Sequence, residues 1–351
     1  SFMVTLILLL LVSLENLEEI KNIRHWLGLG VLVGVSTWVR PEGLTLLGPV
    51  LLAALLLEKN WRRRAAAVGL ALGGFAAFFG PYLFFNRALA GEWWPNTFFA
   101  KQAEYAVHQN IPLVKRLLQQ YGQPLVGAGA ILLPGFGYFI YRMIKEKRWV
   151  VLLGAVWVVG HLSLYALRLP VTYQHGRYVM AGMPVYFLMG FAGVSLLAKP
   201  RSREFWPRVL SMAWLLTLVL VLVGFSVLGA QAYGNDVAFI ETEMVEAARW
   251  IAANTPPDAL IGAHDIGALG YYAHRPILDL AGLVTPDVVP FIRDETRLAE
   301  YLDSQEAAYL VTFPGWYPQL VAGRTPVYET GGIFSQATGG ENMAVYGWRA
   351  P

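Results

Sequence analysis

The chain has 351 residues, of which 56% are hydrophobic and 15% are charged, and its formal net charge is +3. Several apolar runs reach the roughly 20 residues that a membrane-spanning helix needs, so the composition predicts a protein that crosses a membrane several times. There is no cysteine, which excludes disulfide bonds. We expect no nucleic-acid partner.

Charge divides the chain into two parts. Residues 1–230 contain 21 Lys and Arg against 9 Asp and Glu, whereas residues 231–351 contain 6 Arg, no Lys, and 15 Asp and Glu. We therefore expect a mainly α protein with two domains. A polytopic transmembrane helical domain would occupy residues 1–230, and a smaller external, soluble α/β domain would occupy residues 231–351.

The chain opens inside an apolar run. Phe2–Val12 follows neither a start methionine nor a signal-peptide layout, so we expect it to be the end of a truncated helix whose N-terminal part is missing. Counting this run, the hydropathy predicts about eight membrane helices. The other runs are Trp26–Val39, Leu44–Leu57, Ala65–Phe85, Leu125–Tyr141, Trp149–Leu167, Tyr178–Ala198 and Val209–Ala230.

The tetrapeptide Arg40-Pro41-Glu42-Gly43 separates two of these runs, each of about 14 residues or roughly 21 Å of helix. Because the hydrocarbon core is about 30 Å thick, we favour a hairpin of two short helices around residues 40–43 over a single kinked span. Either arrangement places Arg40 and Glu42 at membrane depth, where ionisable groups usually face a cavity or a polar ligand. Arg40 could hold a phosphate there, or it could pair with Glu42 at a polar tip.

Three short connections are rich in Lys and Arg, namely residues 58–64, 142–148 and 199–208. Short basic loops stay in the cytoplasm. Because every second connection between the apolar runs is basic, we expect the remaining segments on the external side. These are the loop 86–124, the segment 168–177 and everything after Ala230. We therefore predict a multi-pass protein of the inner or plasma membrane, with the lipid bilayer as a partner and an external C-terminal domain.

Two of the external segments combine polar groups with aromatic rings. The first contains Asn96 and Lys101, and the second contains His175, Arg177 and Tyr178. Either cluster could be an interfacial aromatic belt with headgroup anchors. Alternatively, rings with interleaved donors grip a sugar or a lipid phosphate, and cationic clusters on one side of the membrane favour an anionic ligand. Together with Arg40 and Glu42, these residues are our candidates for binding a phosphate or another part of a substrate.

After Tyr233 the pattern becomes that of a soluble α/β domain. The amphipathic stretch Glu241–Ala253 predicts a helix, which ends before Pro256-Pro257. Short β-like runs follow at Leu260–Ala263, Ile277–Leu280, Ala308–Phe313 and Met343–Trp348.

Three polar residues lie at the ends of these runs: His264, Asp265 and Asp279. They are candidates for the rim of a binding site on the external domain, although loop caps are equally common at such positions. His264 and His274 lie too far apart, without a third ligand, to support a metal site, so we predict none. The residues neither indicate nor exclude a divalent cation.

Four segments together resemble a known superfamily. They are “TWVRPEG”, “WWPNTFFAK”, “HGRYVMAGMP” and “HDIGALGYYAHRPILDLAGL”, in this order. With them, nearly the whole chain resembles the GT-C superfamily of polytopic glycosyltransferases. It is most similar to bacterial members related to protein mannosyltransferases and terminal arabinofuranosyltransferases.

This resemblance implies an inverting membrane enzyme that transfers a sugar from a polyprenyl-phosphate-linked donor to an acceptor hydroxyl on the external face. The acceptor would be a glycan, a lipid or a protein, and the donor substrate is the only cofactor-like molecule implied. In such enzymes an acidic residue of the first external loop is the general base. That residue would lie upstream of Ser1, so the catalytic residue stays unassigned, with Glu42 as a poor substitute.

Two other classes of function suit the same sequence. A transporter or flippase of lipid-linked sugar would also use paired half-helices, but the large external domain and the lack of an inverted-repeat signature argue against it. The other class is a non-catalytic membrane protein whose external domain binds a glycan or a partner.

Overall fold

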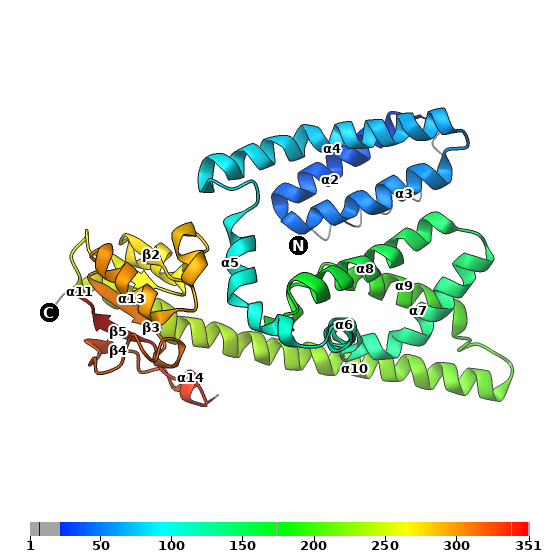
Figure 1. The fold of residues 1–351 in the computed structure, drawn as a ribbon. Coiled ribbons are helices and arrows are strands. Elements are labelled where there is room, and N and C mark those ends of the chain that lie inside the picture. The colour runs from blue at the N-terminus through cyan, green and yellow to red at the C-terminus, as the bar shows by residue number, and fades with distance from the viewer. Residues whose placement is uncertain (1–6, 8–21, 173, 338, 350–351) are drawn as a thin grey trace. The chain divides into compact units, whose positions relative to one another are not determined.

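The computed structural model describes residues 7, 22–172, 174–337 and 339–349 (Figure 1). The chain divides into two compact units. The helical unit contains Ser1–Trp93 and His108–Phe225, and the α/β unit contains Trp94–Val107 and Ser226–Pro351. Apart from Ile7, the predicted run Phe2–Val12 lies outside the described residues.

The helical unit is built from apolar helices joined by short turns. Its helices are α2 (His25–Val39), α3 (Leu47–Leu57), α4 (Trp61–Ala90), α6 (Leu113–Gly122), α7 (Ala128–Lys145), α8 (Trp149–Arg168), α9 (Met183–Leu197) and the first part of α10 (Phe205–Phe239). The 3-10 turns η1 (Pro41–Leu46), η2 (Ala106–Asn110), η3 (Gln123–Leu125) and η4 (Gln174–Gly176) lie between them in the chain.

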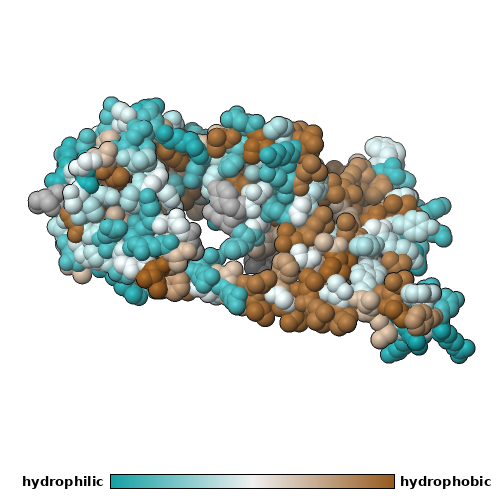
Figure 2. All heavy atoms as spheres, turned by 90° about the horizontal axis from the view of Figure 1, so that it is seen from below, coloured by the Kyte–Doolittle hydropathy of each residue, from teal (hydrophilic) through white to brown (hydrophobic). Residues whose placement is uncertain are grey.

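Several helices suit a membrane by length and composition. Among the described residues, Trp61–Ala90, Trp149–Arg168 and Phe205–Asn254 are long and apolar enough to cross one. A fourth span results if α6 and α7, which are bent by 97°, form one broken span. Three further apolar helices are shorter, so the described part has fewer full-length spans than the sequence predicted. Figure 2 shows large hydrophobic areas on the helical unit, as lipid contact would require.

The break after α2 has a local cause. Pro41 has no amide hydrogen and disfavours a helical conformation at Arg40, which is extended with φ −153° and ψ 135°. The turn η1 then reverses the chain, and Gly43 lies so close to α2 that a Cβ atom there would be 2.6 Å from the Ser36 carbonyl oxygen. α2 and α3 therefore run side by side in opposite directions (Figure 1). At the open end of this hairpin, Trp26 near the start of α2 bonds to Glu58 just after α3.

The backbones of α2 and α4 touch along a seam of glycines. A Cβ atom on Gly30 would lie 2.0 Å from the Ala71 carbonyl oxygen, and one on Gly74 would lie 2.3 Å from the Leu27 carbonyl oxygen. Helices in lipid associate through such close packing, because burial of apolar surface gives little gain there. The seam therefore fixes the hairpin against α4.

The α/β unit contains a five-stranded sheet between two groups of helices. Its helices are α5 (Asn96–Glu104), the end of α10, α11 (Glu246–Asn254), α12 (Ile266–Ala268), α13 (Glu295–Ser304) and α14 (Ile333–Ala337), with the π-helical turns η5 (Ile240–Val245) and η6 (Leu269–Ala273) and the 3-10 turns η7 (Pro286–Phe291) and η8 (Pro314–Trp316). Its strands are β1 (Ile261–Ala263), β2 (Ile277–Asp279), β3 (Tyr309–Thr312), β4 (Tyr328–Glu329) and β5 (Ala344–Gly347).

The strand order is β2-β1-β3-β5-β4. β1 pairs in parallel with β2 and β3, with Ile261 opposite Ile277 and Tyr309, while β5 is antiparallel to β3 and β4. Each of the four predicted β-like runs contains a strand, and β4 is an addition. Alternate residues point to opposite faces, so α11 and η6 cover one face and α13 and η7 cover the other.

The structure differs from the sequence-based expectation at two places. The last apolar run was expected to end at Ala230 and the first helix of the soluble domain to begin at Glu241, but α10, η5 and α11 continue as helix from Phe205 to Asn254. Residues 94–107 were expected to belong with the membrane helices, but α5 packs on η7 and is part of the α/β unit.

Candidate functional site

At the tip of the α2–α3 hairpin, Arg40 and Glu42 form an ion pair with two contacts. The Arg40 Nη2 and Nε atoms donate to the two carboxylate oxygens of Glu42 over 2.8 and 3.3 Å. The Arg40 side chain is 38% exposed, and that of Glu42 is 17% exposed. Glu42 therefore holds one edge of the guanidinium in place, while a substantial part of the guanidinium side chain remains accessible.

Helix α8 supports this pair from a distant part of the chain. The Tyr165 hydroxyl donates to Oε1 of Glu42. The Thr45 hydroxyl donates to the main-chain oxygen of Glu42 over 2.7 Å and accepts a bond of 2.9 Å from Nε1 of Trp157. Because the Glu42 carboxylate already accepts bonds from Arg40 and Tyr165, it is better placed to orient Arg40 than to remove a proton from a substrate.

Aromatic contacts extend the cluster to the segment after α8. The Tyr165 ring lies 5.6 Å from the Tyr178 ring, and Arg177 lies over the Tyr178 ring at 5.2 Å. Buried His161 contacts Tyr165 edge-on and has Nε2 3.1 Å from the Tyr178 carbonyl oxygen, to which it must donate. We call Arg40, Glu42, His161, Tyr165 and Tyr178 the hairpin cluster.

His161 leaves one polar atom of the hairpin cluster unsatisfied. Its side chain is 1% exposed, and among the described residues its Nδ1 atom has no hydrogen-bond partner. Since Nε2 carries the proton, Nδ1 is a buried acceptor. Buried acceptors without a partner are uncommon in folded proteins.

The second group of predicted residues lies where the parallel strands of the α/β unit end. His264 and Asp265 follow β1, and Asp279 is the last residue of β2. The His264 ring is enclosed by three side chains: Nδ1 is 2.6 Å from the Tyr317 hydroxyl, Nε2 is 3.4 Å from Oε1 of Glu104, and the Trp316 ring is edge-on at 5.0 Å. We call Glu104, His264, Trp316 and Tyr317 the strand-edge cluster.

Electrostatics fix the protons of the strand-edge cluster. Burial raises the pKa of Tyr317, and the carboxylates of Glu104, Asp279 and Glu295 raise it further. The phenol therefore stays protonated and donates to Nδ1 of His264. The proton of a neutral His264 ring is then on Nε2, which faces the Glu104 carboxylate.

Asp279 caps a loop. Its side chain is fully buried, with Oδ1 accepting from the Ala281 amide over 2.9 Å and Oδ2 from the Val284 amide over 2.8 Å. Gly282, at φ +68°, allows the turn between them. The same loop is held from outside by Asn96, whose side-chain amide donates to the Gly282 and Leu283 carbonyl oxygens. Both residues are thereby engaged in positioning the loop.

The structure therefore groups the predicted residues differently from the sequence. It joins Arg40 and Glu42 to Tyr178 and Arg177 in the helical unit, where His175 lies exposed at φ +54°. It places Asn96 and Lys101 in α5 of the α/β unit, with the three strand-end residues. Sequence analysis did not select His161, Tyr165, Trp316 or Tyr317, because an apolar helix and a short turn give no local signal of such contacts.

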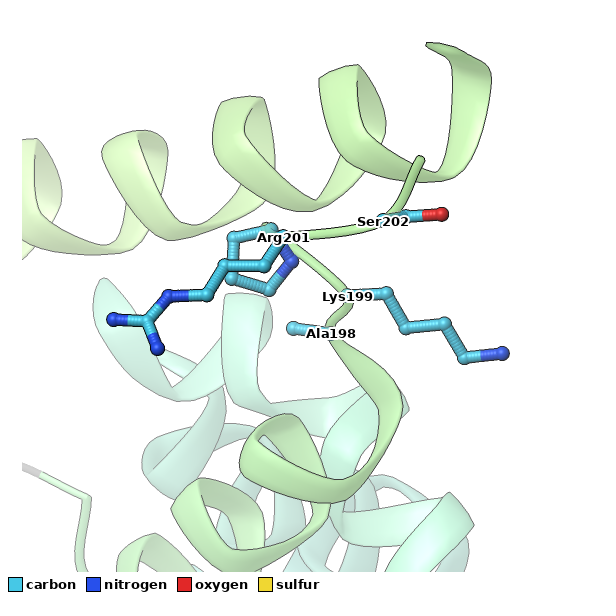
Figure 3. Close-up of a pocket in the computed structure, with 5 residues that line it drawn as sticks. Ala198, Lys199, Arg201 and Ser202 are labelled. Atoms are coloured by element: carbon cyan, nitrogen blue, oxygen red, sulfur yellow. The ribbon is translucent and has the colours of Figure 1, made fainter. Parts of the chain in front are cut away.

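A shallow surface depression lies at the connection between α9 and α10. It is lined by Ala198, Lys199, Pro200, Arg201 and Ser202. In Figure 3 the Lys199 and Arg201 side chains point away from each other, so they do not converge on a common ligand. This basic loop suits a membrane-surface position better than a substrate site.

Comparison with known protein families finds one match. Residues 234–346 match a domain of unknown function, DUF8728, which covers less than half of the chain and lies within the α/β unit. No curated protein matches the chain. The family match thus concerns the strand-edge cluster, except for Glu104, and it assigns no activity.

Proposed function

We propose that the chain is a membrane glycosyltransferase of the GT-C type, which transfers a sugar from a polyprenyl-phosphate-linked donor to an acceptor hydroxyl. The observation that carries this proposal is the ion pair of Arg40 and Glu42 at the break of an apolar hairpin. Burying charged side chains within a membrane costs desolvation free energy, and proteins that keep such charges there usually use them to bind a polar ligand.

Arg40 is suited to the phosphate of the donor. The guanidinium is planar, stays charged and presents five donors in a rigid fork. Glu42 engages Nε and Nη2, which orients the fork, and the exposed part of the side chain is available to a phosphate oxygen. When the glycosidic bond to the phosphate breaks, negative charge develops on the leaving group, and a fixed cation in a water-poor site stabilises it.

The side chains around Arg40 support the charged pair. The Tyr165 and Tyr178 rings are buried and pack against each other, so they hold the pair in place without contacting a sugar. The exposed Arg177 lies over the Tyr178 ring and adds a second cation for an anionic donor. The general base stays unassigned, since Glu42 is occupied by Arg40 and Tyr165.

The proposed location is the inner or plasma membrane, with the basic loops 58–64, 142–148 and 199–208 in the cytoplasm and the α/β unit outside. The lipid bilayer and the lipid-linked sugar are then the partners of the helical unit. A glycan, lipid or protein acceptor would approach from the external side.

The test is sugar transfer by the purified full chain in lipid vesicles, with radiolabelled polyprenyl-phosphate mannose and polyprenyl-phosphate arabinose as donors. We expect Arg40→Ala to lower turnover by about 100-fold or more, as does loss of one oxyanion-type donor. Arg40→Lys should restore only part of the activity, because a point charge cannot replace the bidentate fork. Arg62→Ala, which removes an exposed arginine of the basic loop, is the matched control.

If folded Arg40→Ala turned over the donor at the wild-type rate, Arg40 would not be a ligand of the donor phosphate. Movement of the donor across the bilayer without its consumption would instead favour a flippase. Absence of both activities with either donor would favour a non-catalytic membrane protein.

A further inference from the structure

The strand-edge cluster lies at a topological switch point of the sheet. After β1 the chain moves to the face covered by η6, where Leu269 and Ala273 are buried. After β3 it moves to the opposite face, where Tyr317 and Leu320 are buried. The chain thus leaves the carboxyl ends of two adjacent parallel strands in opposite directions. In open α/β sheets, ligands bind at this place.

Helix α5 adds a carboxylate to this edge. Glu104 is the last residue of α5, and its side chain, 23% exposed, faces Nε2 of His264. Arg293 donates to the main-chain oxygen of Glu104 and not to its carboxylate. Because Tyr317 holds the other nitrogen of His264, the ring is fixed between two partners, and the ring in turn positions Glu104.

Two further groups of this edge face solvent. The Trp316 side chain is 47% exposed, although its ring packs on Phe313 and on His264. Asp265 is partly exposed and does not cap the helix that follows it. Among the described residues, no side chain bonds to the Asp265 carboxylate. An open indole and two carboxylates therefore share one edge of the sheet.

The charge of this edge selects the class of ligand. Three carboxylates, those of Glu104, Asp279 and Glu295, raise the pKa of Tyr317. Arg293 also lies beside Glu104, bonded to its main-chain oxygen, so carboxylates are in excess at this edge and disfavour phosphates and other anions. A quaternary cation would need several open aromatic faces, whereas Trp316 is the exposed ring of this cluster. A neutral polyol suits both features, because it packs on an indole and donates hydroxyl protons to carboxylates.

We propose that the carboxyl edge of β1 and β3 is a binding site for a neutral saccharide. The sugar ring packs on Trp316, and its hydroxyl groups donate to the carboxylates of Glu104 and Asp265, while His264 acts as a positioning residue. The inference goes beyond the proposed transfer reaction, since binding here needs neither Arg40 nor a lipid-linked donor.

The test uses the full chain in lipid nanodiscs and a panel of neutral tetrasaccharides built from mannose, glucose, galactose or arabinose. Saturation-transfer NMR identifies the members that bind, and titration gives their dissociation constants. We expect Trp316→Ala to weaken binding about tenfold or more, since the apolar contact of the indole is lost. Glu104→Gln and Asp265→Asn should weaken it several-fold without loss of fold, because each keeps the shape of the side chain.

The matched control is Tyr271→Ala, which removes another exposed aromatic side chain of the α/β unit, 72% exposed, whose ring contacts Tyr272. It should bind like the wild type, and so should Arg40→Ala, even if Arg40→Ala abolishes transfer. Failure of every tetrasaccharide to bind would overturn the proposal. Equal binding by Trp316→Ala, Glu104→Gln and Tyr271→Ala would also overturn it, as would a preference for choline or glucose 6-phosphate over the neutral sugars.

Discussion

Trp26 and Glu58 join the two ends of the α2–α3 hairpin. The Trp26 indole Nε1 donates to Oε1 of Glu58 over 3.1 Å, across 32 positions of sequence. The other oxygen of Glu58 accepts a bond of 2.8 Å from Arg63, and its main-chain oxygen accepts one from Arg64. One carboxylate thereby ties the start of α2 to the basic loop that precedes the long part of α4.

We expect Trp26→Phe to lower the stability of the helical unit by about 1.5 kcal/mol, because a hydrogen bond to a charged acceptor is lost at a buried position. Thermal unfolding in detergent, followed by circular dichroism, measures the change. Trp61→Phe is the control, since the Trp61 side chain is 73% exposed. Equal melting temperatures for the two variants would show that the Trp26 bond contributes nothing.

The proposed topology is testable by cysteine labelling, because the natural chain has no cysteine. Asn110→Cys and Ser304→Cys place single thiols at exposed positions of segments expected outside. An impermeant maleimide should label both in intact cells and should label Ser202→Cys only after permeabilisation. Protection of Ser304→Cys in intact cells would contradict an external α/β unit.

Asp279→Asn should destabilise the α/β unit by about 3 kcal/mol. The carboxylate accepts from two main-chain amides while fully buried, and an asparagine would turn an NH2 group toward one of them. Hydrogen exchange of the backbone amides in β1, β2 and β3 during heating measures the stability of this unit. Asp258→Asn is the control, because the Asp258 side chain is exposed. Equal destabilisation by the two substitutions would contradict the proposal that Asp279 stabilises the loop.

Alkaline pH should unfold the α/β unit. Burial and a bond to Glu246 raise the pKa of Tyr328 from 10.0 to about 12, and burial also raises the pKa of Tyr317. A raised folded-state pKa favours the protonated phenol, so this contribution to stability is present below pH 10 and declines as the pH rises toward 12.

Tyrosinate absorbance and circular dichroism, recorded together, check this expectation. A fraction of the tyrosines should ionise only as the fold is lost, and Tyr328→Phe should flatten the decline of stability between pH 10 and 12. Ionisation of all tyrosines near pH 10 with no loss of structure would be the opposite result.

Local features of the fold could be predicted from the sequence, and distant contacts could not. The break at Arg40 follows from the next residue being proline, and the strand that ends at Asp279 follows from its β-like run. The packing of α5 on the α/β unit depends on Asn96, whose partners lie 186 and 187 positions away. No pattern within a loop specifies a partner at that distance.

The same limit applies to the candidate site. The charges of Arg40 and Glu42 stand out within apolar sequence, but Tyr165 lies 123 positions from Glu42 in a helix with no unusual composition. His161 was likewise indistinguishable from a core residue, and its unsatisfied Nδ1 is visible only when its neighbours are known. A buried polar atom is a property of the packing and not of the local sequence.

The glycine seam between α2 and α4 makes this part of the chain sensitive to volume alone. Serine and alanine are small residues that membrane helices accept readily. At Gly30 or Gly74, however, either would push α2 and α4 apart, because the two backbones leave no room for a Cβ atom there. On the outward side of α10, Leu216 and Leu220 are more than half exposed and could exchange with any apolar residue. Natural variation should therefore be wide on α10 and nearly absent at these two glycines.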